Sequence, residues 1–339
     1  MATLLTPLGN IMFPHELDTL SFERDDAAET YFRLRIDVDG ETMFEAKQHF
    51  APTDALHTLT GMATFLMDLM PTDGTPCTLQ LWVMLSDGTW ETLTTTLLHC
   101  RHRCALTAEE MAASHFLTPC RGRKTTHALA TEHLSAWNAE AATQATVLGV
   151  WIDAAGDYHQ HTGRLNVVPG TYDECHIDVS PSVVDAALCP DTDGWQMARY
   201  IVKLGNRTME YHVRPTAELP AESIEFRNGF GCWDTFHLWG TVEREVKVER
   251  EAAIINGLRQ NYRVKATPEF KGHTGLMSDE ELPLFTDLTT ATECRRNGKR
   301  ITITESEEKV SSSPHAAAEA TLTWRESEEG VCLQPGALT

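Results

Sequence analysis

The stretch FRNGFGCWDTFHLW, residues 226–239, combines turn signals with a densely aromatic segment. Asn228-Gly229 is a turn dipeptide, and Gly231 adds a position suited to a bulge or a close backbone approach. From residue 232 onward, bulky apolar groups fall on both faces of the expected strand, which is typical of a strand that is central in a sandwich or covered by a partner. We therefore favour a core or assembly strand over a pocket in which tryptophan stacks on a sugar. The candidate contact residues here are Trp233, Phe236, His237 and Trp239.

Strands with turn signals between them recur along most of the chain. Residues 31–38 place apolar side chains at every second position before the turn dipeptide Asp39-Gly40, which predicts a β-hairpin. Residues 78–100 form a second predicted hairpin. Between the two hairpins, residues 53–70 carry apolar side chains at spacings of three and four, which predicts an amphipathic helix.

The spacing of these signals indicates the fold class. From residue 143 onward, turns recur at intervals that are typical of β-sandwiches rather than βαβ units. Ser278 and Glu281 are spaced as the capping box of a short helix. The sequence therefore predicts a mainly β protein with two or three β-sandwich-like domains and a few short helices. The expected segments are an N-terminal β-rich domain with one helix (1–105), a connector or extended arm (106–142), a middle β-sandwich-like domain (143–220) and a C-terminal β-rich domain with one capped helix (221–339).

Charge is the strongest global signal. The 339 residues include 49 acidic and 28 basic side chains, a net charge of −21. A surface this negative repels the phosphate backbone, so we expect no sequence-specific nucleic-acid binding, although a channel wall past which DNA slides is compatible with it. Arg121, Arg123 and Lys124 form a local basic cluster, which is either a docking patch for the acidic surface of another copy or a solvated loop.

Two further patterns bear on location. The sequence contains no run of eighteen apolar residues, so we expect no membrane span. Its first residues lack a basic region followed by an apolar core, so we expect no signal peptide and retention in the cytoplasm until assembly. Nine cysteines at irregular spacing argue against a disulfide framework and favour buried thiols.

The segment HCRHRC offers the best candidate for a metal site. On a strand its Cys100, His102 and Cys104 share one face, and Cys120 or His115 would complete a tetrahedral set. The spacing is not that of paired C-x2-C knuckles, so buried thiols are the favoured interpretation.

Other sites are weaker. His159 and His161 share a face of another expected strand, but without a third ligand a solvent-exposed hairpin is favoured. The sequence contains no G-x-S-x-G elbow and no cysteine in an activating context. We therefore predict no metal, no cofactor and no enzymatic activity, with hydrolysis of cell-envelope polymers as the enzymatic alternative.

Several motifs together resemble a known group of proteins. They are FLTPCRGRKTTHALATEHLSAW, GNRTMEYHV, IEFRNGFGCWDTFHLWG, SDEELPLFTDLTT, ITITESEEKVS and LTWRESEE. The series resembles the β-rich, tail- or baseplate-type structural proteins of phages and prophages of Bacteroides-group gut bacteria. The resemblance covers residues 100–339 and is patchy before them.

The resemblance implies a non-enzymatic virion protein of a phage tail, as a distal tail, hub or baseplate component assembled in the host bacterial cytoplasm. Such a protein acts as a homo-oligomer, for example a ring, in contact with other tail proteins. The alternative, motivated by Trp233 and Trp239, is a carbohydrate- or cell-surface-binding β-sandwich module.

Overall fold

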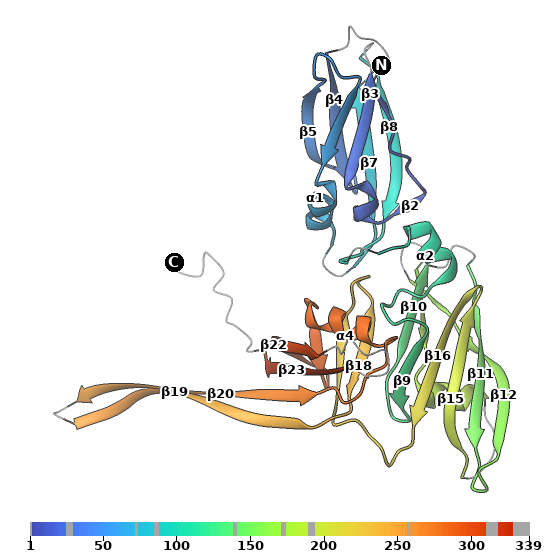
Figure 1. Cartoon of the computed structure of the whole chain (residues 1–339), viewed down its shortest axis with the longest axis vertical. Coiled ribbons are helices and arrows are strands. Elements are labelled where there is room, and N and C mark those ends of the chain that lie inside the picture. The colour runs from blue at the N-terminus through green and yellow to red at the C-terminus, as the bar shows by residue number, and fades with distance from the viewer. Residues whose placement is uncertain are drawn as a thin grey trace, which may run out of the picture.

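The computed structural model describes residues 2–24, 30–71, 74–84, 88–102, 104–137, 141–170, 174–188, 194–255, 258–309 and 318–327. Over these residues the chain forms five β-sheets and four α-helices, which confirms the mainly β, multi-domain prediction (Figure 1). None of the helices in this part of the chain is long and apolar enough to cross a membrane.

The N-terminal domain consists of two sheets that enclose one core, together with the 3-10 helix η1 (Pro14–Leu17) and helix α1 (Met62–Leu69). The predicted hairpins are present, and the first turns at Asp39 and Gly40, with φ of 50° and 83°. In sheet order, the strands are β1 (Ala2–Leu4), β3 (Thr19–Arg24) and β6 (Leu56–Thr60), then β2 (Ile11–Met12), β8 (Trp90–Leu97), β7 (Cys77–Met84), β4 (Tyr31–Val38) and β5 (Glu41–His49).

The predicted helix over residues 53–70 is only half present. Its first part is strand β6, which pairs with β3, and its second part is helix α1. Gly61 separates them in the left-handed region, with φ of 79°. A glycine adopts this conformation at little cost, so the chain changes from strand to helix at this residue.

The middle domain again contains two sheets, with helices α2 (Ala108–Ser114) and α3 (Pro181–Leu188). Residues 106–142 do not form the connector or extended arm that was predicted. They supply α2 and one strand to each sheet, because β9 pairs in parallel with β16, and β10 pairs with β14. In sheet order, the strands are β12 (Tyr158–Asn166), β11 (Gln144–Ile152), β15 (Gln196–Leu204), β16 (Arg207–Arg214) and β9 (Arg123–His127), then β10 (His133–Trp137), β14 (Glu174–Asp178) and β13 (Val168–Pro169).

The C-terminal domain is built on one seven-stranded sheet with helix α4 (Leu282–Thr289). Only half of the predicted capping box forms: the Glu281 side chain accepts a hydrogen bond from the Ser278 amide at 3.3 Å, but Glu281 itself is the N-cap residue of α4, and within the described residues no side chain caps the helix. In sheet order, the strands are β18 (Trp233–Leu238), β17 (Glu222–Arg227), β21 (Cys294–Arg296), β22 (Lys299–Lys309), β23 (Glu319–Glu326), β20 (Leu258–His273) and β19 (Val242–Ile255).

Strands β19 and β20 form a long two-stranded ribbon, residues 242–255 and 258–273, which we call the arm. Figure 1 shows it projecting sideways from the body of the molecule. Strand β20, for which the sequence offered no prediction, pairs with β19 along the ribbon and with β23 over Phe270–His273.

The middle and C-terminal domains share a single hydrophobic core. It runs from Tyr200 and Tyr211, stacked with ring centroids 4.8 Å apart in the middle domain, to Phe285 and Trp324 in the C-terminal domain. The N-terminal domain has a core of its own. The middle and C-terminal domains therefore pack as one body, to which the N-terminal domain is joined.

The turn at residues 228–231 contacts the N-terminal domain and so contributes to the join between it and the other two domains. The ring of Phe230 lies 6.0 Å from that of Phe13, and the Gly229 carbonyl accepts a hydrogen bond from the Arg101 amide at 2.7 Å. Gly231 touches Gly74 backbone to backbone, since a Cβ atom on Gly231 would lie 2.2 Å from the Cα of Gly74. The opening motif therefore provides a docking turn between domains.

We expect Gly231→Ala to loosen this join. Gly231 has a φ of +79°, so alanine meets both left-handed strain and the Gly74 backbone. The matched control is Gly40→Ala, where φ is +83° and nothing lies within 4 Å, so only the strain of about 1–2 kcal/mol applies. Thermal unfolding and limited proteolysis should show the larger loss for Gly231→Ala. Equal losses in the two variants would contradict the proposed role of the contact.

Candidate functional site

A cluster of charged side chains lies buried between the middle and C-terminal domains. Lys124 Nζ donates to Glu132 Oε2 at 2.7 Å and to Asp234 Oδ1 at 2.8 Å. The second oxygen of Glu132 accepts from Thr126 Oγ1 at 2.8 Å and lies 2.8 Å from His237 Nε2. Glu132 is fully buried, and Lys124 is 3% exposed. We call these five residues the ionic cluster.

The polar atoms around the ionic cluster are also hydrogen-bonded. The second oxygen of Asp234 accepts from Thr118 Oγ1 at 2.6 Å. His237 Nδ1 lies 2.8 Å from Ser223 Oγ, and the Glu132 amide donates to Ser180 Oγ at 3.0 Å. Buried charges are tolerated when they are paired and their remaining atoms are satisfied, which is the case here.

The local fold explains how these residues meet. Strand β9 carries Lys124 and Thr126 and ends at His127, and the chain then turns back so that the Ala130 amide donates to the His127 carbonyl at 2.9 Å. This turn returns Glu132 toward Lys124. Strand β18 supplies the remaining two members, so two of the motifs that carry the resemblance meet in one cluster.

The electrostatics favour the charged forms of Lys124 and Glu132. Burial disfavours the ammonium of Lys124, but Asp234 and Glu132 outweigh it and raise the pKa of Lys124 above its ordinary value. Burial also disfavours the carboxylate of Glu132, yet Lys124 and His237 lower the pKa of Glu132 to about 2. Burial and the neighbouring His237 lower the pKa of His127 to about 4. Neither Lys124 nor Glu132 therefore exchanges a proton near neutral pH, as a general acid or base would.

A second buried cation, Arg207, holds backbone carbonyls. Its guanidinium donates to the carbonyl of Trp137 at 2.6 Å, to that of His115 at 3.2 Å, and to that of Ala112. Arg207 belongs to the GNR motif and directly follows the turn at Gly205, where φ is 58°. This motif therefore fastens helix α2 and the end of β10 to strand β16 within the middle domain.

The predicted metal ligands line one pocket of about 800 Å³, namely Cys100, His102, Cys104, His115 and Cys120. His102 Nε2 lies 2.9 Å from Asp287 Oδ1, while the Cys100 thiol donates to the carbonyl of His102 at 2.8 Å. Burial raises the pKa of Cys100 to about 12 and also raises that of Cys120, so both are inert thiols at neutral pH. In the part of the chain that the structure describes, no group of three or more His, Cys, Asp or Glu side chains is arranged to hold a metal ion.

The two histidines of strand β12 have other partners. His159 Nε2 lies 2.9 Å from Asp153 Oδ2, and its ring stacks on Trp195 with centroids 3.8 Å apart. His161 lies edge-on to Trp151, with centroids 5.5 Å apart.

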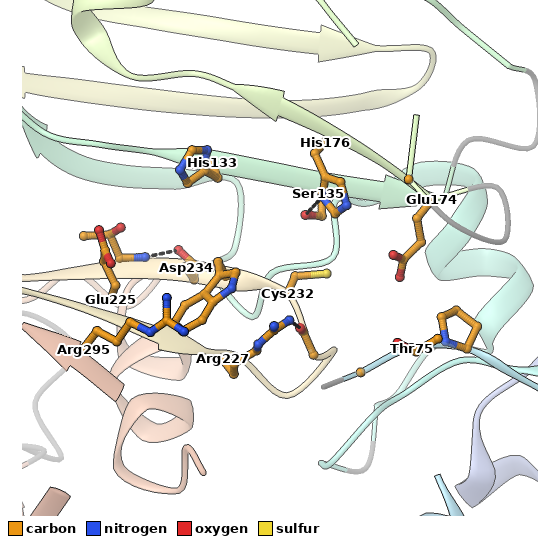
Figure 2. A pocket seen from close by; sticks show the side chains of 16 residues that line it. Thr75, His133, Ser135, Glu174, His176, Glu225, Arg227, Cys232, Asp234 and Arg295 are labelled. Atoms are coloured by element: carbon orange, nitrogen blue, oxygen red, sulfur yellow. Dashed lines mark hydrogen bonds between the residues drawn. The ribbon is translucent and has the colours of Figure 1, made fainter. Parts of the chain in front are cut away.

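A pocket of about 550 Å³ lies where the three domains meet (Figure 2). Gly74, Thr75 and Pro76 come from the N-terminal domain, and the middle and C-terminal domains supply the rest of the lining. The charged and polar side chains of that lining include His133, Ser135, Glu174, His176, Arg227 and Arg295. Residues 231–235 of the opening segment, for which a core or assembly strand is favoured over a pocket, line it. The other walls come from segments that are distant in the sequence, so no local pattern predicts the whole pocket.

Ser135 and His176 form a hydrogen-bonded pair in this pocket, 2.9 Å from Oγ to Nδ1. They lie opposite each other on β10 and β14. Burial, His133 and Arg227 lower the pKa of His176. Ser135 is 5% exposed within a regular strand, so it is not presented on a strained turn as a nucleophilic serine is. The pair is therefore a structural hydrogen bond between neighbouring strands.

The predicted contact residues of β18 fall into two groups. Phe236 and His237 are each 4% exposed, and Phe236 packs against Phe285 with ring centroids 5.5 Å apart. As contacts with another molecule they are contradicted, because the chain itself encloses them. Trp233 and Trp239 are half-buried.

Both tryptophans stack on arginine. The guanidinium of Arg295 lies 4.3 Å from the ring centroid of Trp233, and that of Arg227 lies 4.8 Å from it. The guanidinium of Arg214 lies 4.3 Å from the ring centroid of Trp239. These rings therefore already have partners of the kind that aromatic faces attract.

The basic cluster at residues 121–124 is also divided. Arg121 and Arg123 are exposed, and Arg123 pairs with Glu280 of the same chain at 2.8 Å. Lys124 is buried in the ionic cluster, so its predicted role in a docking patch is contradicted.

The comparisons with known proteins identify no family. No family model matches the chain, and no curated protein matches it. A similar solved structure is described as a Ca2+-stabilized adhesin that helps an Antarctic bacterium reach out and bind ice. It shares 11% sequence identity, the match covers 96% of this chain and 73% of that one, and the TM-score is 0.16. A TM-score this low supports no conclusion about fold or function.

We expect Lys124→Met to destabilise the protein by about 3–5 kcal/mol, because two buried carboxylates lose their cation. The adjacent Arg123→Met is a matched control that breaks an exposed ion pair and should cost about 0–1 kcal/mol. Urea unfolding monitored by tryptophan fluorescence measures both. An equal loss in the free energy of unfolding for the two variants would show that the buried ionic cluster stabilises the protein no more than an exposed ion pair does.

We also expect a stability loss in acid that depends on Glu132. Its pKa is about 2 in the folded protein against an ordinary value of 4.5, so the unfolded chain takes up the proton first. The contribution of Glu132 to the free energy of unfolding is complete above pH 4.5 and is lost as the pH falls toward 2. Glu132→Gln, although less stable overall, should show a flatter pH dependence in this window. An unchanged slope in that variant would rule out this assignment.

Proposed function

We propose that this chain is a non-enzymatic structural protein of a phage tail, as a distal tail, hub or baseplate component. It acts through oligomeric protein–protein contacts within the virion and is assembled in the host bacterial cytoplasm. The resemblance of residues 100–339 to tail-type proteins supports the proposal, as does the net charge of −21, which suits a surface past which DNA slides.

The observation that carries the proposal is the arm. Two-stranded ribbons are marginally stable in water on their own, and this one exposes apolar side chains along its length. Val246 is 51% exposed, Ile254 77% and Leu258 65%. Such residues on a projecting ribbon favour a protein that completes its packing on a partner.

The chemistry of the buried polar residues points in the same direction. The motifs of the resemblance place Lys124 and Asp234 in a contact that joins the middle and C-terminal domains, and place Arg207 in contacts that hold helix α2 within the middle domain. These buried charged residues therefore stabilise one arrangement of the domains, which suits a structural component that holds its neighbours in fixed positions within an assembly. The carbohydrate-binding alternative is less favoured, because the rings of Trp233 and Trp239 stack on arginines.

The proposal is tested on particles. Mass spectrometry of virions from the strain that encodes this chain should detect it together with tail-tube proteins, and particles from a strain lacking its coding sequence provide the control. Light scattering of the purified protein should report an oligomer. A stable monomer that is absent from purified particles would refute the proposal.

A further inference from the structure

The arm has sheet edges that another chain can extend. Strand β19 is the terminal strand of its sheet. Within the described residues, β20 pairs with β23 only over Phe270–His273, so most of β20 lies beyond that partner. The sixteen residues of β20 span about 50 Å, which carries the distal end well away from the body. Edges of this kind are templates for pairing between chains.

The apolar residues at the distal end lie on both faces of the ribbon. Leu258 is paired with Ile255, the neighbour of Ile254 on the same strand. Since successive residues of a strand point to opposite faces, Ile254 and Leu258 lie on opposite faces, and both are largely exposed. Covering both requires a partner that receives the distal end rather than one that lies against a single face.

The charge of the arm differs in sign from that of the rest of the chain. Residues 242–273 include seven basic and five acidic side chains, a net charge of +2. The other 307 residues include 21 basic and 44 acidic side chains, a net charge of −23. Arg250 and Arg259 are exposed near the apolar residues of the distal end. A second copy of the same chain therefore offers a body of complementary charge.

We propose that the distal end of the arm, residues 250–255 and 258–259, inserts into the acidic body of a second copy of this chain. The inference rests on the proposed function and names its partner. Apolar contacts of Ile254 and Leu258 provide the affinity, and the basic side chains select the acidic surface. Because the arm of one copy meets the body of the next, the contact is head-to-tail and closes into a ring or continues as a filament.

The test measures the oligomeric state of the full chain by light scattering and sedimentation. The double variant Ile254→Asp/Leu258→Asp should weaken self-association about tenfold or more, since it places charges at a desolvated contact. Arg250→Glu/Arg259→Glu should also weaken it, and the wild-type association should fall as salt rises. The control is Leu276→Asp, at a residue outside the arm that is 66% exposed, close to the 65% of Leu258.

The outcomes separate this inference from the proposed function. An oligomer that Ile254→Asp/Leu258→Asp dissociates and Leu276→Asp does not would support the arm contact. An oligomer that survives both variants would overturn the arm contact and leave the proposed function standing. A monomeric wild type would overturn self-association through the arm, and it would do so even if the arm binds a different tail protein. Detection of the chain in virions would then decide the proposed function separately.

Discussion

The arrangement of the middle and C-terminal domains depends on one buried ion pair system. Lys124 holds Glu132 from its own domain and Asp234 from the next, and each carboxylate is in turn fixed by hydroxyl or imidazole groups. Buried ion pairs contribute little net stability when compared with apolar residues of the same shape, but they tolerate few alternative arrangements. The cluster therefore acts mainly on specificity, by allowing one relative placement of strands β9 and β18.

This constraint also explains where sequence reasoning succeeded and where it failed. The hairpin around Asp39-Gly40 was predictable, because alternation and turn chemistry agreed there. The polar character of Lys124, Thr126 and Glu132 indicates a solvent-facing connector over residues 106–142, whereas the ionic cluster buries all three side chains. Their partners on β18 lie more than a hundred residues away, so no local pattern reveals the pairing.

Other differences have local causes. The segment 53–70 satisfies a helical spacing, yet pairing with β3 turns its first part into a strand, as tertiary contacts often override local preference. Strand β20 contains Pro268 and lacks regular alternation, so no pattern predicts it. In the candidate site, the density of aromatic residues in FRNGFGCWDTFHLW was recognised. The roles of its individual residues, as docking turn, core and ion-pair partner, follow only from the fold.

The shared core and the attachment of the arm together determine how a pulling force on the arm is distributed through the molecule. A pull on the arm is transmitted through β20 to β23, and through Trp324 into the core common to the middle and C-terminal domains. The N-terminal domain, with a separate core, is held by the turn at residues 228–231 and by a smaller apolar cluster in which Phe13 and Leu98 pack with helix α2 and Trp137. Under tension the arm therefore pulls on one large core, whereas the N-terminal domain pulls on a separate, smaller apolar cluster and on the glycine contact between Gly74 and Gly231.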